Sequence, residues 1–141
     1  MDRGVLAQLP EWFWGVPYDG ARIPGSSDDD RDLVRGANCQ MWAFGVLAWF
    51  GQVIPPFRSD ELWFDESVTR RVEVPEPLDL LLHNSNDEPF GAHVGLWTGS
   101  GVAHLAREIG RPVVWSEDEL MSRERYATRV GIKRLLPTES G

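Results

Sequence analysis

The hydrophobic pattern of the chain changes between its first and second halves. Over residues 37–50 apolar side chains fall on every side of a helix, and a helix that is apolar all round is a buried one. Asn38 provides a polar start for this helix, and Gly51 stands where a C-terminal cap belongs. After Pro77 short apolar runs alternate with turn residues, a pattern typical of strands. The expected strands cover residues 78–82, 93–98, 102–105, 112–115 and 129–135.

Two shorter helices complete the expected elements. Ser59 is a candidate cap for a helix that runs to Phe64, and Ser116 is a candidate cap for a helix over residues 117–126. The order of elements therefore places helices first and a mostly antiparallel sheet second. This order predicts an α+β fold in which the buried helix packs on the sheet.

Length and net charge limit the number of domains and the kinds of partner that this chain can have. A chain of 141 residues is long enough for one domain with a core and too short for two, so we expect a single domain with tails at 1–10 and 136–141. The 14 basic and 22 acidic residues leave a net charge of −8, which argues against nucleic acid as a partner. The acidic run from Asp28 to Asp30 also favours a cationic or neutral substrate over an anionic one.

No segment predicts contact with a membrane. The longest apolar run, from Met41 to Phe50, has ten residues, whereas a bilayer span needs roughly 20. The start of the chain lacks the pattern of a signal peptide. The single cysteine cannot form an internal disulfide, which fits a reducing compartment. We therefore expect a cytoplasmic protein without a membrane partner.

The single cysteine is the first candidate for chemistry. Cys39 falls in the first turn of the predicted buried helix, where unpaired backbone N–H groups and the positive end of the helix dipole favour a thiolate. A lone cysteine beside apolar residues is more often a small buried hydrophobe. Cys39 alone therefore does not predict catalysis.

Two histidines strengthen the hypothesis that Cys39 is catalytic. Residues 98–101 form a Gly-rich turn between two apolar runs, which predicts a β-hairpin. A two-residue or four-residue loop pairs residues whose numbers sum to 199, and this register places His93 and His104 on one face as diagonal neighbours. They can then form a hydrogen bond. A three-residue loop would instead place them on opposite faces of the sheet.

A thiol, a base and a group that orients the base are the parts of a nucleophilic hydrolase. In this interpretation Cys39 attacks a carbonyl, His93 takes the thiol proton, and His104 holds the His93 ring in the required tautomer. The backbone N–H of Cys39 is a candidate oxyanion donor. This chemistry needs no metal and no cofactor, and its substrate is a peptide or a small-molecule amide.

Several motifs around these residues resemble a known family. The segments GVPY, PLDL, HVGLW and VAHL begin at Gly15, Pro77, His93 and Val102. In these segments, and in a cysteine that opens a buried helix, the chain is similar to the NlpC-type cysteine peptidases, papain-like hydrolases that cut bacterial cell-wall peptides. The resemblance spans about residues 15–135 and implies a papain-like NlpC-type fold.

The resemblance also assigns roles to residues. It implies that Cys39 is the nucleophile, His93 the base, His104 the third residue, and that Tyr18 lies near the oxyanion or substrate site. The family usually has Asp before the cysteine and Ser-Gly after it, whereas this chain has Asn38 before it and Gln40 and Met41 after it. The environment on the substrate side therefore differs. The further candidate substrate contacts are Asn38, Gln40, Trp42 and Trp97.

Three alternatives remain open. Cys39, His93 and His104, with His83, would suit a zinc ion, although no pair has the usual short ligand spacing and His83 reads most simply as a surface residue. A catalytically degenerate papain-like binding or immunity protein would keep the fold without the reaction. An acyltransferase would use the same thiol and pass the acyl group to an amine or an alcohol.

Overall fold

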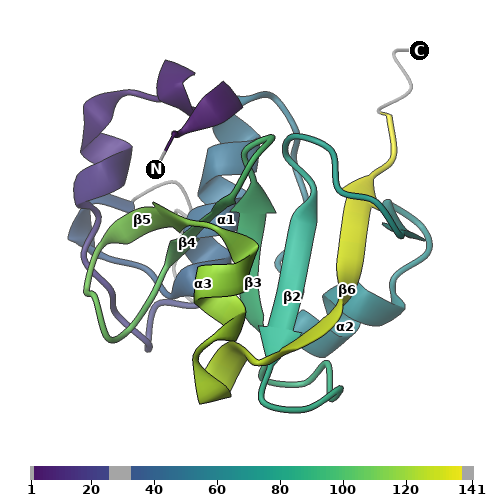
Figure 1. Cartoon of the computed structure of the whole chain (residues 1–141). Coiled ribbons are helices and arrows are strands. Elements are labelled where there is room, and N and C mark those ends of the chain that lie inside the picture. The colour runs from purple at the N-terminus through teal and green to yellow at the C-terminus, as the bar shows by residue number, and fades with distance from the viewer. Residues whose placement is uncertain (1, 26–32, 138–141) are drawn as a thin grey trace.

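A computed structural model describes residues 2–25 and 33–137 of the chain. Its centre is a six-stranded sheet in the order β1-β6-β2-β3-β4-β5, in which every neighbouring pair is antiparallel (Figure 1). The expected α+β class with a mostly antiparallel sheet is confirmed. The strands are β1 (Thr69–Val72), β2 (Leu80–Asn84), β3 (His93–Trp97), β4 (Val102–Leu105), β5 (Pro112–Trp115) and β6 (Thr128–Leu135).

The long apolar segment forms α1 (Cys39–Trp49), with both predicted ends. The Asn38 side chain accepts a hydrogen bond from the Met41 N–H at 2.8 Å, and Gly51 has a φ of +83°, a conformation that favours glycine at a helix end. In Figure 1 this helix lies behind the sheet, where it packs on β3 and β4.

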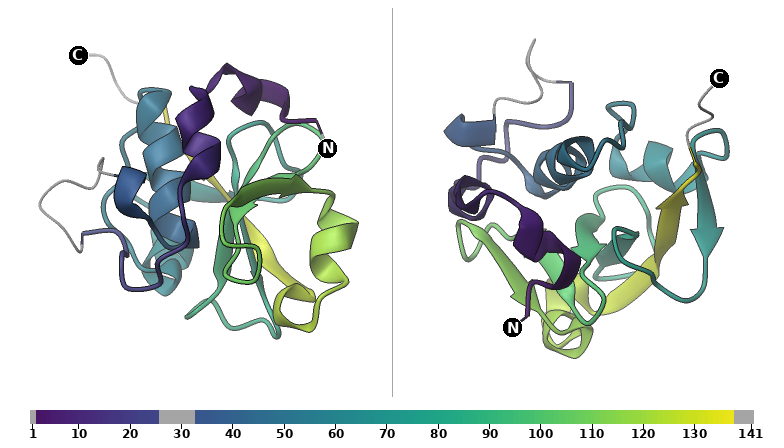
Figure 2. Two further views of the ribbon diagram at one scale, coloured as in Figure 1. Left: turned by 90° about the vertical axis from the view of Figure 1, so that its left-hand side faces the viewer. Right: turned by 90° about the horizontal axis from the view of Figure 1, so that it is seen from above.

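The N-terminal segment explains why α1 is apolar all round. Three short 3-10 helices, η1 (Gly4–Gln8), η2 (Glu11–Gly15) and η3 (Leu33–Arg35), lie beside α1 (Figure 2). Among them η2 packs on β5 and on η3, and η3 packs on α1. Leu6 in η1 is completely buried. The expectation of an N-terminal tail over residues 1–10 is therefore wrong, because this segment packs on the core. Within residues 2–25 and 33–137, no helix is both long enough and apolar enough to cross a bilayer.

A second, smaller apolar cluster lies on the opposite face of the sheet, under α3 (Glu117–Met121). Ser116 caps α3 as predicted, since its hydroxyl accepts the Glu119 N–H at 3.1 Å. The single helix predicted over 117–126 is wrong. Arg123 has an extended backbone, and the chain continues as a separate turn, η4 (Glu124–Tyr126), which buries Tyr126 against the sheet.

Two further details differ from the expectations. The edge strand β1 is absent from the predicted elements, because its sequence TRRV has no apolar run and its pairing with β6 is needed to define it. Ser59 is the first residue of α2 (Ser59–Phe64) and not its cap. Its hydroxyl accepts the Gly91 N–H at 2.9 Å and so ties α2 to the segment that leads into β3.

The register of the β3–β4 hairpin is the one expected. Leu96 pairs with Ala103 and Trp97 pairs with Val102, so the paired numbers sum to 199. Gly95 is required in this register, because a Cβ there would lie 2.6 Å from the nearest Val102 methyl carbon. The hairpin therefore places both histidines of this region on the same face of the sheet.

Candidate active site

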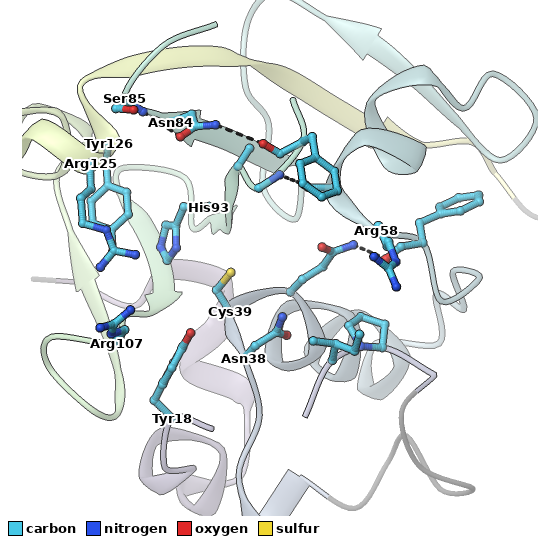
Figure 3. Close-up of a pocket in the computed structure, with 18 residues that line it drawn as sticks. Tyr18, Asn38, Cys39, Arg58, Asn84, Ser85, His93, Arg107, Arg125 and Tyr126 are labelled. Atoms are coloured by element: carbon cyan, nitrogen blue, oxygen red, sulfur yellow. Dashed lines mark hydrogen bonds between the residues drawn. The ribbon is translucent and has the colours of Figure 1, made fainter. Parts of the chain in front are cut away.

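A pocket of about 370 Å³ opens where the first turn of α1 meets the start of β3 (Figure 3). Its size falls in the range of small-molecule and peptide sites. Cys39 and His93 both line it, and Figure 3 shows the sulfur of Cys39 and the ring of His93 facing each other across the inner end of the pocket. The two residues come from different elements, which only the packing of α1 on the sheet brings together.

The surroundings of the thiol act on its pKa in opposite directions. Burial raises the pKa of Cys39, while the backbone N–H groups of Val94, Gln40 and Cys39 itself act to lower it. The burial effect is the larger, so the thiol of the resting protein is protonated at neutral pH. The thiolate expected from the helix N-terminus alone is therefore not the resting state, because desolvation outweighs the backbone dipoles.

His93 forms a hydrogen-bonded pair with His104. Their Nε2 and Nδ1 atoms are 2.9 Å apart, and the two rings are almost perpendicular, at 88°. The Tyr126 ring also packs against His93, with ring centroids 4.5 Å apart and the planes tilted by 36°. These contacts hold the His93 ring in place. Because Nε2 is bound to His104, Nδ1 is the nitrogen that can accept a proton from a group in the pocket.

Both histidines are held in the neutral form. Burial lowers the pKa of His93 well below its ordinary value, with His104 adding to the shift, and it lowers the pKa of His104 to about 4. At neutral pH the pair therefore carries no charge. A neutral imidazole is the form that can accept a proton from a thiol.

The tautomers of the pair follow from what the base must do. His93 can accept the thiol proton at Nδ1 only when its own proton is on Nε2, from which it donates to His104 Nδ1. His104 then carries its proton on Nε2, an atom that is buried and has no hydrogen-bond partner in the described part of the chain. The Trp115 ring packs on His104 at 4.6 Å and 66°, a geometry compatible with a weak N–H contact to an aromatic face.

Three of the predicted substrate contacts do line the pocket: Tyr18, Asn38 and Gln40. Tyr18 arrives through a bridge with Ala37, in which the Asp19 N–H donates to the Ala37 carbonyl at 2.8 Å. Burial raises its pKa, and the charge of Cys39 adds to the shift. The Asn38 side chain caps α1, and the Gln40 amide donates to the Phe57 carbonyl, so both are held by the fold.

The two predicted tryptophan contacts lie elsewhere. Trp42 is completely buried in the core, where its indole N–H donates to the Phe13 carbonyl at 2.9 Å. Trp97 is at the far end of β3 from His93 and packs in the cluster under α3. Neither residue lines the pocket. The sequence of a helix that is apolar all round does not show which side faces the pocket, and Trp97 shares the face of His93 but lies four residues further along β3.

The expectation that His83 is a surface residue is wrong. β2 extends to Asn84, and His83 is fully buried, directly across from His93 in the sheet. Its Nε2 lies 2.8 Å from a Glu117 carboxylate oxygen, and Arg129 pairs with the same carboxylate. Burial lowers the pKa of His83. The hydrogen bond to Glu117 explains how a polar residue can occupy this buried position.

Other pocket residues escaped the sequence analysis. Arg107 follows β4, and Arg125 and Tyr126 follow α3, at the end of the segment that was expected to form one helix. The Tyr126 hydroxyl donates to Glu108 at 2.8 Å, and burial raises its pKa. No local pattern distinguishes these residues, because two separate connections, from β4 to β5 and from α3 to β6, bring them to the pocket.

Neither metal ligation nor known relatives identify the site. Among residues 2–25 and 33–137, no group of three or more His, Cys, Asp or Glu side chains is arranged to hold a metal ion. Comparison with known proteins finds no family model that matches this chain and no match among curated proteins.

Proposed function

We propose that this protein is a cysteine hydrolase that cleaves an amide or peptide bond through an acyl intermediate on Cys39. One observation carries the proposal: the thiol at the start of α1 opens into the pocket that His93 lines, and His93 is hydrogen-bonded to His104 at 2.9 Å. A thiol, a neutral base and a group that orients the base meet at one cavity.

The reaction follows from the protonation states. The Cys39 sulfur attacks the carbonyl carbon while its proton passes to His93 Nδ1, since a raised thiol pKa and a lowered imidazole pKa disfavour a preformed ion pair. The backbone N–H of Cys39, at the start of the helix, is the candidate donor to the oxyanion. His93 then gives the proton to the departing amine.

The second half of the cycle restores the enzyme. A water molecule attacks the thioester carbon and loses its proton to His93, and the carboxylic acid product leaves as the proton returns to the sulfur. His104 accepts the Nε2–H of His93 throughout and stabilises the imidazolium that forms twice in each cycle. It is a positioning residue in this scheme.

The resemblance to NlpC-type cysteine peptidases supports the same proposal. That family combines a cysteine at the start of a buried helix with a histidine at the start of an HVG-type strand, and α1 and β3 begin at Cys39 and His93. A papain-like NlpC-type identity is therefore part of the proposal. The substrate would be a cell-wall-type peptide or a related amide.

The competing proposal is a binding protein of the same fold that has lost catalysis. The observation that favours it is the raised pKa of Cys39, which is typical of a structural thiol. In that case His93 and His104 would be a buried polar pair with no part in a reaction. The two proposals differ in whether an activated ester acylates Cys39.

The test is acylation by p-nitrophenyl acetate at pH 7.5, followed by release of p-nitrophenol and by intact mass. We expect the wild type to gain one acetyl group, which is then lost by hydrolysis, and Cys39→Ala to gain none above background. His93→Ala should acylate at least 10²-fold more slowly, a typical loss of general-base catalysis.

Circular dichroism and urea unfolding serve as folding controls for both variants. Equal acylation rates in the folded wild type and in folded His93→Ala would contradict the proposal. So would a wild type that acylates no faster than Cys39→Ala. Either result would favour the binding protein.

A further inference from the structure

The pocket has the opposite charge from the protein as a whole. The chain has a net charge of −8, yet among residues 2–25 and 33–137 the pocket lining includes Arg58, Arg107 and Arg125 and no Asp or Glu. His93 is neutral at pH 7 because burial lowers its pKa. The expectation of a cationic or neutral substrate came from the total charge and from Asp28 to Asp30, which lie outside the described residues. The pocket lining points the other way.

Two of the arginines lie on the same side of the reacting groups. In Figure 3 Arg107 and Arg125 stand beside Tyr18 and His93, whereas Arg58 lies on the far side of Cys39. The positive charges of Arg107 and Arg125 both act on Tyr18, and the charge of Arg125 also acts on Cys39 and His93. They therefore form one cationic wall next to the thiol.

Arg107 is available to a ligand. Its side chain is exposed at the pocket, and it makes no hydrogen bond or ion pair with any residue in the described part of the chain. A guanidinium group presents up to five N–H donors in a planar fork that matches a carboxylate.

Arg125 is only partly neutralised. It forms an ion pair with Glu108 that is 3.6 Å long, and 58% of the arginine side chain is exposed. The Glu108 carboxylate also accepts the Tyr126 hydroxyl, at 2.8 Å and 3.0 Å from its two oxygens, so it is shared between two partners. Arg125 therefore keeps donors that face the pocket.

We propose that the substrate carries a carboxylate next to the scissile bond and that Arg107 and Arg125 bind it. This inference rests on the proposed function, because it names the substrate class of the same site. Carboxylates are the ordinary anionic groups of peptides and amides, and an arginine pair binds them with directed hydrogen bonds as well as charge. The substrate class is an acidic amide, in which the bond cut lies beside an acidic side chain or a free carboxyl group.

The experiment compares two alkylating reagents that differ in one charge. Iodoacetate carries a carboxylate, and iodoacetamide is neutral. In both reactions the Cys39 sulfur attacks the CH₂ carbon of the reagent, a C–S bond forms, and iodide leaves. The measured quantity is the ratio of their rate constants at pH 9, divided by the same ratio for the protein unfolded in urea. We expect a normalised ratio above one that falls as salt is added, because salt screens exposed charges.

The arginine variants assign the effect to residues. Arg107→Gln and Arg125→Gln should each lower the normalised ratio about threefold to fivefold, the upper range for one exposed charge pair. The matched control is Arg70→Gln, which removes the same charge from an exposed position on β1, outside the pocket. It should leave the ratio unchanged.

The two proposals fail in different ways. If iodoacetamide labels the folded protein but the normalised ratio is one or lower, the net charge of −8 dominates and the carboxylate inference is overturned alone. The same holds if all three arginine variants behave alike. If neither reagent labels Cys39 until the protein unfolds, the proposed function is wrong and the substrate inference fails with it.

Discussion

The buried histidines make the protein sensitive to mild acid. The chain has three histidines, and burial lowers the pKa of each of them in the folded protein. Between their folded and unfolded pKa values the unfolded chain binds more protons than the folded one. Acid therefore favours unfolding, and stability is lost as the pH falls below about 6.5, the ordinary pKa of histidine.

The size of the effect is best defined for His104. Its pKa falls from 6.5 in the unfolded chain to about 4 in the folded protein. Proton linkage with these two values removes about 2 kcal/mol of the free energy of unfolding at pH 5, and about 3 kcal/mol below pH 4. The carboxylates of Glu108 and Glu117 have lowered pKa values, so their contribution is lost only below about pH 4.5. The histidines therefore dominate between pH 7 and pH 5.

Urea unfolding at pH 7, 6 and 5 measures this effect. We expect the wild type to lose at least about 2 kcal/mol between pH 7 and pH 5, since His93 and His83 add to the His104 contribution. In His104→Gln, which keeps an amide that can accept the proton of His93 Nε2, the loss should be smaller by about 2 kcal/mol. Only the change with pH is compared, so the cost of the substitution itself cancels.

Two outcomes would refute the reasoning. If the wild type is equally stable at pH 7 and pH 5, the histidines are not held neutral by burial. If His104→Gln has the same pH dependence as the wild type, His104 titrates near its ordinary pKa. Protonation of the pair at neutral pH would also remove the neutral base on which the proposed reaction depends.

Substitutions at Asn38 and Gly131 test two contacts that the structure predicts to stabilise the fold. Asn38→Ala should lower the free energy of unfolding by about 1 kcal/mol, because it removes the cap of α1. Asn38→Asp should keep most of that stability, because aspartate can also cap a helix. Equal losses in the two variants would show that the cap contributes nothing. Gly131→Ala should cost about 1 to 3 kcal/mol, because its Cβ would lie 2.1 Å from the Trp63 ring. Gly15→Ala, which meets nothing within 4 Å, is the matched control, and urea unfolding checks all four variants.

Local sequence predicted the elements whose signal is short-range. The cap at Asn38, the glycine after α1 and the Ser116 cap each act within a few residues, and all three are found as predicted. The hairpin register also follows from local rules, because the four-residue turn 98–101 determines which residues pair. These features needed no knowledge of the rest of the chain.

The predictions that were wrong share a cause: each depended on contacts between segments that are far apart along the chain. His83 was expected at the surface because the segment HNSN is polar, but its pairing with Glu117 keeps it inside the sheet. β1 has no local signal and exists because β6 offers it an edge. Trp42 and Trp97 were expected near the substrate because of their distance along the chain. Packing instead buries Trp42 in the core, and Trp97 lies at the opposite end of β3 from His93, so neither lines the pocket.

The sequence by itself therefore determined the parts of the candidate chemistry: a thiol at a helix start and two histidines on one face of a hairpin. Tertiary structure alone decided what surrounds them. It buried the thiol and both imidazoles, which set the direction of their pKa values, and it brought Arg107 and Arg125 to a pocket of an otherwise acidic protein. Burial and pocket charge depend on residues far apart along the chain, so no local pattern can contain them.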